Sequence, residues 1–218
     1  RSELFGMKLL VIGATGATGQ EIVSQALAEG HQVTALVRDG AKAHFPPQVT
    51  KATGDVLDYE SLFSASDGKE AVISSLGSGP TGPFKEITML SEGTKNLIKA
   101  MQAQNVRRLV CITGLGAGDS KGHGPWWYNW LVQPLVLRGV YHDKTRQEKV
   151  VRASGLEWTL VRPGALTNGP AKGSGAVRVL TDLTGKYAGT ISRADVAAFC
   201  LSEVTASRYR HQAPVITY

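Results

Sequence analysis

The chain has 218 residues, of which 42% are hydrophobic and 19% are charged, and its formal net charge is +6. The length predicts a single domain, and the hydrophobic content is sufficient for a sizeable core, which excludes disorder as the main state. The positive charge is modest and no basic run alternates with aromatic residues, which argues against a nucleic-acid-binding protein.

Cysteine content and the chain's N-terminal segment indicate the cellular setting. Cys111 and Cys200 are too few for a disulfide framework, and neither has a second Cys or a His at metal-ligand spacing. No apolar run is long enough to span a membrane, and the first residues lack the plan of a signal peptide. We therefore expect a cytoplasmic protein with no metal and no integral membrane segment. Residues 1–6 are expected to be a cloning remnant, and a single domain is assigned to residues 7–218.

Short apolar runs alternate with longer segments of helical period, a pattern typical of strand-helix-strand units in a parallel sheet. The predicted strands are 8–12, 32–37, 49–53, 71–76, 108–113, 157–161 and 214–218. The predicted helices are 17–29, 84–104, 142–153 and 193–204. The expected fold class is α/β: a Rossmann-like, doubly wound and mostly parallel sheet with helices on both faces.

Gly and Ser concentrate in three segments, each of which follows a predicted strand. In a doubly wound sheet the ligand binds beside the carboxyl ends of the strands, so we expect these segments to face one cleft. The loops assigned to a small substrate-binding region are 77–83, 114–140 and 164–190.

The glycine-rich segment 13–19 lies between the first predicted strand and the first predicted helix. A dinucleotide pyrophosphate needs close backbone approach and free N–H groups at a helix N-terminus, and such a turn supplies both. The alternative is a tight turn whose small residues serve packing only, although the hydroxyls of Thr15 and Thr18 argue for phosphate. The residues assigned to the phosphate site are Gly13, Thr15, Gly16, Ala17, Thr18 and Gly19.

The G-x-x-G-x-x-G spacing of this turn resembles the extended and atypical branches of the short-chain dehydrogenase/reductase superfamily. Further matching segments are LVRD at 36–39, GDVLD at 54–58, AVISSLG at 71–77, SEGTKNLIKA at 91–100, SGLEWTLVRPGAL at 154–166 and ISRADVAAF at 191–199. Together, in this order, they are similar to the atypical group that holds biliverdin reductase B (flavin reductase) and the NmrA-like proteins.

The residue after the second predicted strand selects the cofactor in this fold, because it meets the adenosine ribose. An acidic residue there selects NAD, whereas an Arg accommodates the 2′-phosphate of NADP. Here the residue is Arg38, and Lys42 adds a second cation nearby. We therefore expect NADP as cofactor, with NADPH preferred over NADH. The alternative is that Arg38 pairs with Asp39 on the surface.

The resemblance implies further cofactor contacts along the chain. It places Asp55 and Val56 at the adenine, Leu76 and Gly77 beside the pyrophosphate and ribose, and Pro163, Ala165 and Leu166 at the nicotinamide carboxamide. For Asp55 the alternative is a turn-forming Asx residue after Gly54.

Three residues are candidates for catalysis: Thr113, Tyr141 and Lys144. Thr113 ends the fifth predicted strand, where the superfamily carries its catalytic Ser, and its hydroxyl can hold the nicotinamide or the substrate. In the superfamily a Lys follows the catalytic Tyr by four residues, but no Tyr here has a Lys at that spacing. The resemblance instead aligns Lys144 and Glu148 with the start of the helix that backs the cofactor. This departure argues against alcohol, ketone and epimerase chemistry.

A flavin, quinone or tetrapyrrole ring needs less proton-transfer machinery, because solvent or a nearby cation can supply the proton. Lys144 can stabilise the negative charge on the reduced ring, unless it is only a solvated residue on a helix face. The expected function is an NADPH-dependent oxidoreductase that transfers hydride to a flavin, quinone or related conjugated ring. The alternative is an NmrA-like redox sensor that binds NADP without turnover and regulates a partner protein.

Segment 122–137 has 16 residues without Asp, Glu, Lys or Arg and holds three of the four tryptophans. Three interpretations are open: a lid or wall over a flat aromatic substrate, a dimer or membrane-surface patch, and a helix packed into the core. Trp126 and Trp127 are the predicted substrate contacts. We expect a small aromatic substrate and a monomer or homodimer.

Overall fold

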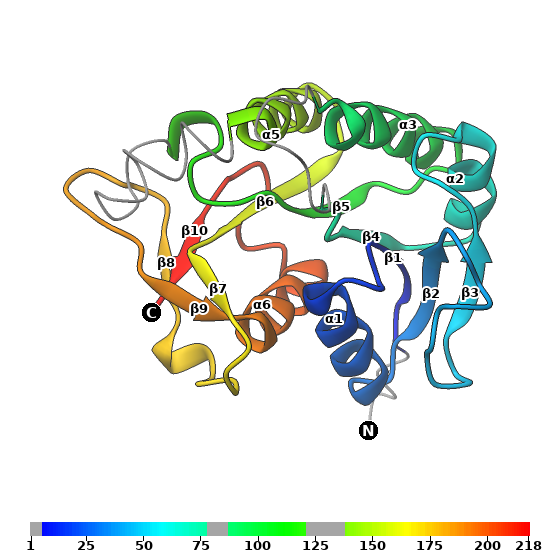
Figure 1. The fold of residues 1–218 in the computed structure, drawn as a ribbon, viewed down its shortest axis with the longest axis horizontal. Helices are drawn as coiled ribbons and strands as arrows, with labels where there is room; N and C mark the ends of the chain where they lie inside the picture. Colours follow the sequence, from blue (N-terminus) through cyan, green and yellow to red (C-terminus); the bar gives the residue numbers. More distant parts are fainter. Residues whose placement is uncertain (1–5, 78–86, 121–137) are drawn as a thin grey trace.

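A computed structural model describes residues 6–77, 87–120 and 138–218, whose main sheet has eight strands (Figure 1). In spatial order these strands are β3 (Thr50–Thr53), β2 (Gln32–Val37), β1 (Lys8–Ile12), β4 (Ala71–Ser74), β5 (Arg108–Ile112), β6 (Glu157–Pro163), β10 (Val215–Thr217) and β8 (Arg178–Leu180). Neighbouring strands pair in parallel except β10 with β8. The predicted Rossmann-like, doubly wound sheet is therefore confirmed.

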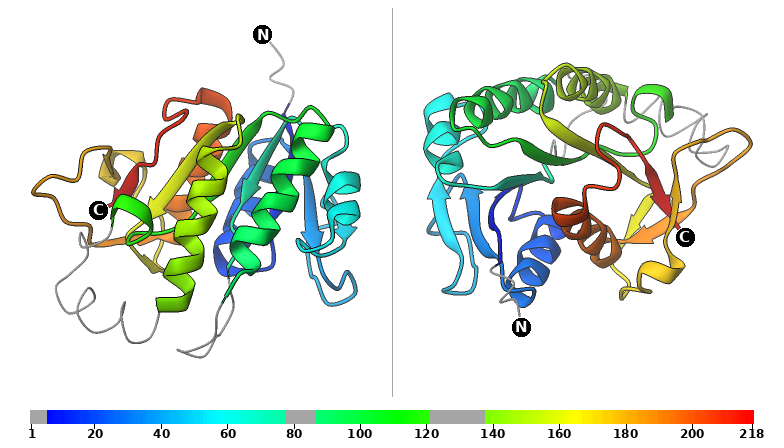
Figure 2. Two further views of the ribbon diagram at one scale, coloured as in Figure 1. Left: turned by 90° about the horizontal axis from the view of Figure 1, so that it is seen from above. Right: turned by 180° about the vertical axis from the view of Figure 1, so that it is seen from behind.

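Five described α-helices cover the two faces of this sheet (Figures 1 and 2). They are α1 (Ala17–Ala28), α2 (Tyr59–Ser66), α3 (Met89–Ala103), α5 (Arg138–Arg152) and α6 (Arg193–Ala206). Helices α1 and α6 pack together over one face, and α2, α3 and α5 lie side by side over the other. The two larger hydrophobic clusters, one on each face, form most of the core of this three-layer arrangement, and a smaller third cluster includes Leu180 of β8 and Val215 of β10.

The first strand-helix unit follows the sequence pattern closely. Leu9, Leu10 and Val11 of β1 are fully buried, because neighbouring strands and helices enclose a central parallel strand on both faces. Helix α1 ends one residue before its predicted limit, and Gly30 follows with a positive φ of 83°, which suits the end of a helix.

Helix α3 begins later than predicted and leaves Ile87 and Thr88 outside it. The backbone of Thr88 is not helical, and the cap comes from Asp143 of α5. The Asp143 carboxylate accepts hydrogen bonds from the N–H groups of Leu90 at 2.8 Å and Ser91 at 3.3 Å. A cap from a helix so far along the chain leaves no local sequence signal, which explains the wrong start.

Several short elements were not predicted. Helix α2 follows Asp58, whose carboxylate accepts a hydrogen bond from Glu60 N–H and caps it. The predicted loop 164–190 contains β7 (Ala165–Thr167) and β8, and β7 pairs with β9 (Thr190–Ser192) in a separate two-stranded sheet. Strands of three residues are too short to show a period-two pattern.

Helix α5 starts earlier than predicted, at Arg138, so the loop assigned to 114–140 ends sooner than expected. Lys144 and Glu148 therefore lie in the middle of this helix and not at its start. Strand β4 stops at Ser74, two residues before its predicted limit, and the three residues that follow line a cleft. Among the described helices, none is long and apolar enough to cross a membrane.

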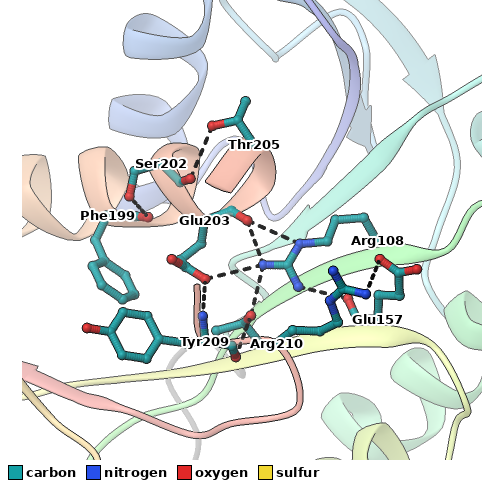
Figure 3. A network of polar contacts seen from close by, with 9 residues as sticks. Arg108, Glu157, Phe199, Ser202, Glu203, Thr205, Tyr209 and Arg210 are labelled. Atoms are coloured by element: carbon teal, nitrogen blue, oxygen red, sulfur yellow. Dashed lines mark hydrogen bonds and ion pairs between the residues drawn. The ribbon is translucent and has the colours of Figure 1, made fainter. Parts of the chain in front are cut away.

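Arg108 of β5 joins segments that lie far apart in the chain (Figure 3). Its side chain is buried and donates to the main-chain oxygens of Glu203 at 2.6 Å and Glu157 at 2.8 Å. It also donates to Thr159 Oγ1, and the Glu203 carboxylate lies 3.5 Å from its Nη2. That carboxylate accepts a hydrogen bond from Tyr209 N–H at 3.0 Å. Burial lowers the pKa of Arg108, and the charge of Glu203 opposes this shift.

Arg108→Met should lower the free energy of unfolding by about 3–5 kcal/mol, because the Glu203 carboxylate then loses its buried cationic partner. Urea denaturation measures the change. Arg107→Met is the matched control, because Arg107 is exposed beside it, and the expected change there is within about 0.5 kcal/mol. Equal losses in the two variants would contradict a stabilising role for the buried Arg108 network.

Candidate functional site

A cleft of about 980 Å³ opens at the carboxyl ends of the parallel strands. Every described residue that the sequence assigned to cofactor binding or catalysis lines this cleft. These residues are Gly13, Thr15, Gly16, Ala17, Thr18, Gly19, Arg38, Asp55, Val56, Leu76, Gly77, Thr113, Tyr141, Lys144, Pro163, Ala165 and Leu166. Trp126 and Trp127 fall outside the described residues, as does the whole of 122–137.

The structure gives different reasons for the presence of glycine at the three positions of the first turn. Gly13 has a positive φ of 74°, and a Cβ there would lie 2.5 Å from the Ser75 main-chain oxygen. A Cβ on Gly19 would lie 2.1 Å from the Gly13 main-chain oxygen. These two glycines serve close packing. Gly16 has an ordinary φ of −73°, and the nearest atom to its Cβ would be the Gly13 main-chain oxygen at 3.4 Å, an ordinary van der Waals contact, so a Cβ fits there without strain.

The N-terminus of α1 is built to receive an anion. Gly16 occupies the cap position, and because it has no side chain, nothing from that residue satisfies the N–H groups of the first turn. The hydroxyls of Thr15 and Thr18 make no hydrogen bond within the described chain. These groups, together with the positive end of the helix, fit the pyrophosphate of a dinucleotide.

The charged residues after β2 pair differently from the sequence expectation. Asp39 forms an ion pair of 3.1 Å with Lys42, and its carboxylate also accepts hydrogen bonds from the main chain. The Lys42 hydrogen bond is the main cause that lowers the pKa of Asp39. Lys42, the second cation expected nearby, is not among the residues that line the cleft. Arg38 is exposed, lines the cleft and makes no hydrogen bond or ion pair within the described chain, so its pairing with Asp39 is excluded.

Asp55 both forms a turn and lines the cleft, which are the two roles that the sequence allowed for it. Its Oδ1 accepts a hydrogen bond of 2.8 Å from Leu57 N–H, which is an Asx turn. The residue also lines the cleft beside Val56. The turn uses one carboxylate oxygen and leaves the other for a ligand.

Thr113, which follows β5, forms hydrogen bonds to α5 through its hydroxyl and its main-chain oxygen. Its hydroxyl donates a hydrogen bond of 2.8 Å to Oε1 of Glu148, a residue of α5 that is buried behind the cleft. Its main-chain oxygen accepts a hydrogen bond from Lys144 Nζ at 2.5 Å. The Thr113 hydroxyl proton is donated to Glu148, so this hydroxyl can hold nicotinamide or substrate only through its oxygen lone pairs.

Lys144 is not a solvated residue on a helix face. Its side chain is half-buried, and Nζ lies 5.5 Å from the centre of the Tyr141 ring. A Cβ on Gly114 would come within 3.0 Å of the same nitrogen, so Gly114 leaves the space that the ammonium occupies. Burial lowers the pKa of Lys144 to about 8, with the charge of Glu148 acting in the opposite direction. The cleft thus holds a lysine whose pKa lies well below that of an exposed lysine.

Sequence reasoning did not select some residues that line the cleft. Met89 begins α3, and no local pattern marks it as a cleft residue. Arg193 begins α6, and its Nη1 donates to Asn168 Oδ1 at 2.5 Å. A signal for Arg193 was present, because it belongs to the segment 191–199 that carried the family resemblance.

Comparison with known proteins agrees with this geometry. A family model described as NAD(P)H-binding matches residues 13–207. The chain belongs to this NAD(P)H-binding family. The match begins at the glycine turn and extends through α6, so it spans all the strand ends that form the cleft. The predicted likeness to the atypical short-chain dehydrogenase/reductase group is confirmed.

Individual relatives cover most of the chain. A Bacillus subtilis protein named as an uncharacterized sugar epimerase, YhfK, is 33% identical over 196 residues, which are 88% of this chain and 85% of that protein. The structure of ChuY, an anaerobilin reductase from Escherichia coli O157:H7, has a TM-score of 0.81 at 24% identity and covers 96% of each chain.

A short-chain dehydrogenase/reductase from Veillonella parvula DSM 2008, solved in complex with NADP, has a TM-score of 0.78 at 19% identity. It covers 97% of this chain and 94% of its own. At this identity the likeness shows the fold.

Proposed function

We propose that the protein is an NADPH-dependent reductase that transfers hydride to a flavin, quinone or related conjugated ring. The observation that carries this proposal is the half-buried ammonium of Lys144 in the cleft beside Thr113, without a Tyr at the spacing of the superfamily dyad. Reduction of a conjugated ring places negative charge on the ring, which a nearby cation stabilises. The name of ChuY as a reductase supports this assignment.

Epimerase chemistry, which the name of YhfK suggests, is less well supported. Short-chain dehydrogenases that act on alcohols or sugars use a Tyr to move a proton to and from oxygen. In this chain Tyr141 has its Lys only three residues later, and that Lys contacts the Thr113 main-chain oxygen.

Bound NADPH supplies the hydride in this proposal, and the chain supplies position and charge. The first turn of α1 would hold the pyrophosphate at Gly16, and Arg38 would hold the 2′-phosphate. The main chain from Pro163 to Leu166 would hold the carboxamide, as the family resemblance implies. Lys144 holds its positive charge where the reduced ring gains electrons, and solvent or this lysine supplies the proton.

Loss of NADPH absorbance tests the proposal with FMN, riboflavin, quinones and biliverdin as acceptors. We expect turnover with at least one of these rings. NADPH binding without oxidation in the presence of any of them would contradict the reductase and favour the redox-sensor alternative. Activity on sugars or simple ketones only would favour the epimerase or dehydrogenase class.

Arg38→Ala should remove most of a ten- to hundredfold preference for NADPH over NADH. A charge-assisted hydrogen bond contributes about 1.5–3 kcal/mol, and about 1.4 kcal/mol corresponds to tenfold in affinity. Calorimetry with both cofactors measures the preference. Lys42→Ala is the matched control, because Lys42 is paired with Asp39 outside the cleft and should leave the preference unchanged. Equal affinity of the wild type for both cofactors would contradict the assignment of Arg38.

A further inference from the structure

Glu148 lies behind the cleft and does not line it, yet it touches a residue that does. The residue is 2% exposed, and its carboxylate is fully engaged. Oε1 accepts hydrogen bonds from Thr113 Oγ1 at 2.8 Å and from Arg162 Nε at 2.9 Å. Oε2 accepts a hydrogen bond from Arg162 Nη2 at 2.5 Å. A Cβ on Gly118 would lie 2.8 Å from this oxygen, so the backbone of Gly118 packs directly against the Glu148–Arg162 pair and leaves no room for a side chain.

Two residues on the same face of α5 form hydrogen bonds with Thr113. Lys144 and Glu148 are four residues apart, and residues at this spacing lie one above the other on a helix. Lys144 donates to the main-chain oxygen of Thr113, and Glu148 accepts from its hydroxyl. The buried carboxylate and the ammonium in the cleft thus share one neighbour.

We propose that Glu148 is a positioning residue of the reductase site, which fixes the Thr113 hydroxyl and keeps Lys144 in its charged form. This inference rests on the proposed function. A hydroxyl has one proton, and here the Glu148 carboxylate accepts it. Thr113 therefore offers only lone pairs to the cleft and acts there as an acceptor. At this end of the cleft the positive charge comes from Lys144.

The groups around Lys144 explain how Glu148 controls its charge. The Tyr141 ring lies beside the ammonium, and the nearby titratable groups that act on it are Cys111 of β5 and Glu148 of α5. Arg162 of β6 and Arg152 of α5 pair with Glu148. Burial lowers the pKa of Lys144 to about 8, and burial raises the pKa of the Cys111 thiol to about 12. The Cys111 thiol is therefore neutral at the pH at which Lys144 loses its proton. Among these neighbours, Glu148 is the anion that stabilises the ammonium.

Glu148→Gln tests this assignment because it keeps the shape of the side chain and removes its charge. Neutral Gln removes the attraction between the Glu148 carboxylate and the ammonium, so the pKa of Lys144 should fall further. We expect kcat for FMN reduction to fall about tenfold, and the alkaline limb of the pH profile to move about one pH unit lower. The affinity for NADP should change less, because Glu148 does not line the cleft.

The titration of Lys144 itself gives a readout that does not depend on activity. NMR of isotope-labelled lysine side chains in the cofactor-free protein, with Lys144→Arg to identify the signal, should show the lower pKa in Glu148→Gln. Glu60→Gln is the matched control, because Glu60 is exposed on α2, and it should leave both the titration and the pH profile unchanged. A folded Glu148→Gln protein with an unchanged Lys144 titration would overturn the proposal.

Thr113→Val is a second variant, which keeps the Glu148–Arg162 pair and so protects the fold if Glu148→Gln proves unstable. It should lower kcat without moving the Lys144 titration, and Thr113→Ser should restore the rate. A Thr113→Val protein as active as wild type would overturn the Thr113 part of the proposal. If wild type reduces no acceptor, the proposed function fails, whereas the NMR titration still decides whether Glu148 controls the charge of Lys144.

Discussion

Gly16→Val should weaken NADP binding by about a hundredfold or more while the protein stays folded. The structure separates Gly16 from its neighbours, because its backbone φ is ordinary and a Cβ would meet no atom closer than 3.4 Å. A branched side chain at this cap position would occupy the space where pyrophosphate approaches the first turn of α1. Each charge-assisted hydrogen bond lost there costs about 1.5–3 kcal/mol, so loss of two is enough for the expected effect.

Calorimetry with NADP and a thermal unfolding curve together measure the result. Gly175→Val is the matched control, because Gly175 is exposed, lies outside the cleft, and likewise accepts a Cβ without a clash. Gly13→Val and Gly19→Val should instead lose stability, since their Cβ atoms would lie 2.5 Å and 2.1 Å from main-chain oxygens. Wild-type affinity in a folded Gly16→Val protein would rule out the turn as the pyrophosphate site.

The sequence predicted this turn because its signal is local. Strand β1 and helix α1 have strong and different hydrophobic periods, and the glycines lie in the few residues between them. The convergence of the other cleft residues was also predictable, because parallel strands place their carboxyl ends at one edge of the sheet. The residues after β2, β4, β5 and β6 meet there for this reason.

The pairing of charges within the site was not predictable from spacing. Asp39 pairs with Lys42 and leaves Arg38 open, and which neighbour it selects depends on how the main chain turns after β2. The bond between Thr113 and Glu148 joins β5 to α5 across 35 positions of sequence. Such contacts depend on how a helix packs on the sheet. The residues of the site could therefore be predicted from the sequence, whereas their ion pairs and hydrogen bonds became known only from the fold.

Lys144→Ala should lower kcat for ring reduction by about a hundredfold or more, the effect of removing one group that stabilises developing charge. Its ammonium is half-buried at the cleft, where surrounding protein strengthens its electrostatic effect. Tyr141→Phe should cost less than about a hundredfold, because no Tyr-Lys dyad of superfamily spacing is present. The two variants therefore separate stabilisation by a cation from proton transfer by a tyrosine.

The pH dependence of the reduction rate is a second way to distinguish the role of Lys144 from that of Tyr141. Lys144 carries its charge below its pKa of about 8 and loses it above, so the wild-type rate should fall as pH rises through this value. Lys144→Ala should lack this alkaline limb, and Lys144→Arg should lack it too while keeping part of the rate, because Arg stays protonated. Steady-state kinetics of the variants with FMN and NADPH decide the matter. A loss of a thousandfold or more in Tyr141→Phe would instead assign the proton to Tyr141 and make the protein a tyrosine-dependent dehydrogenase.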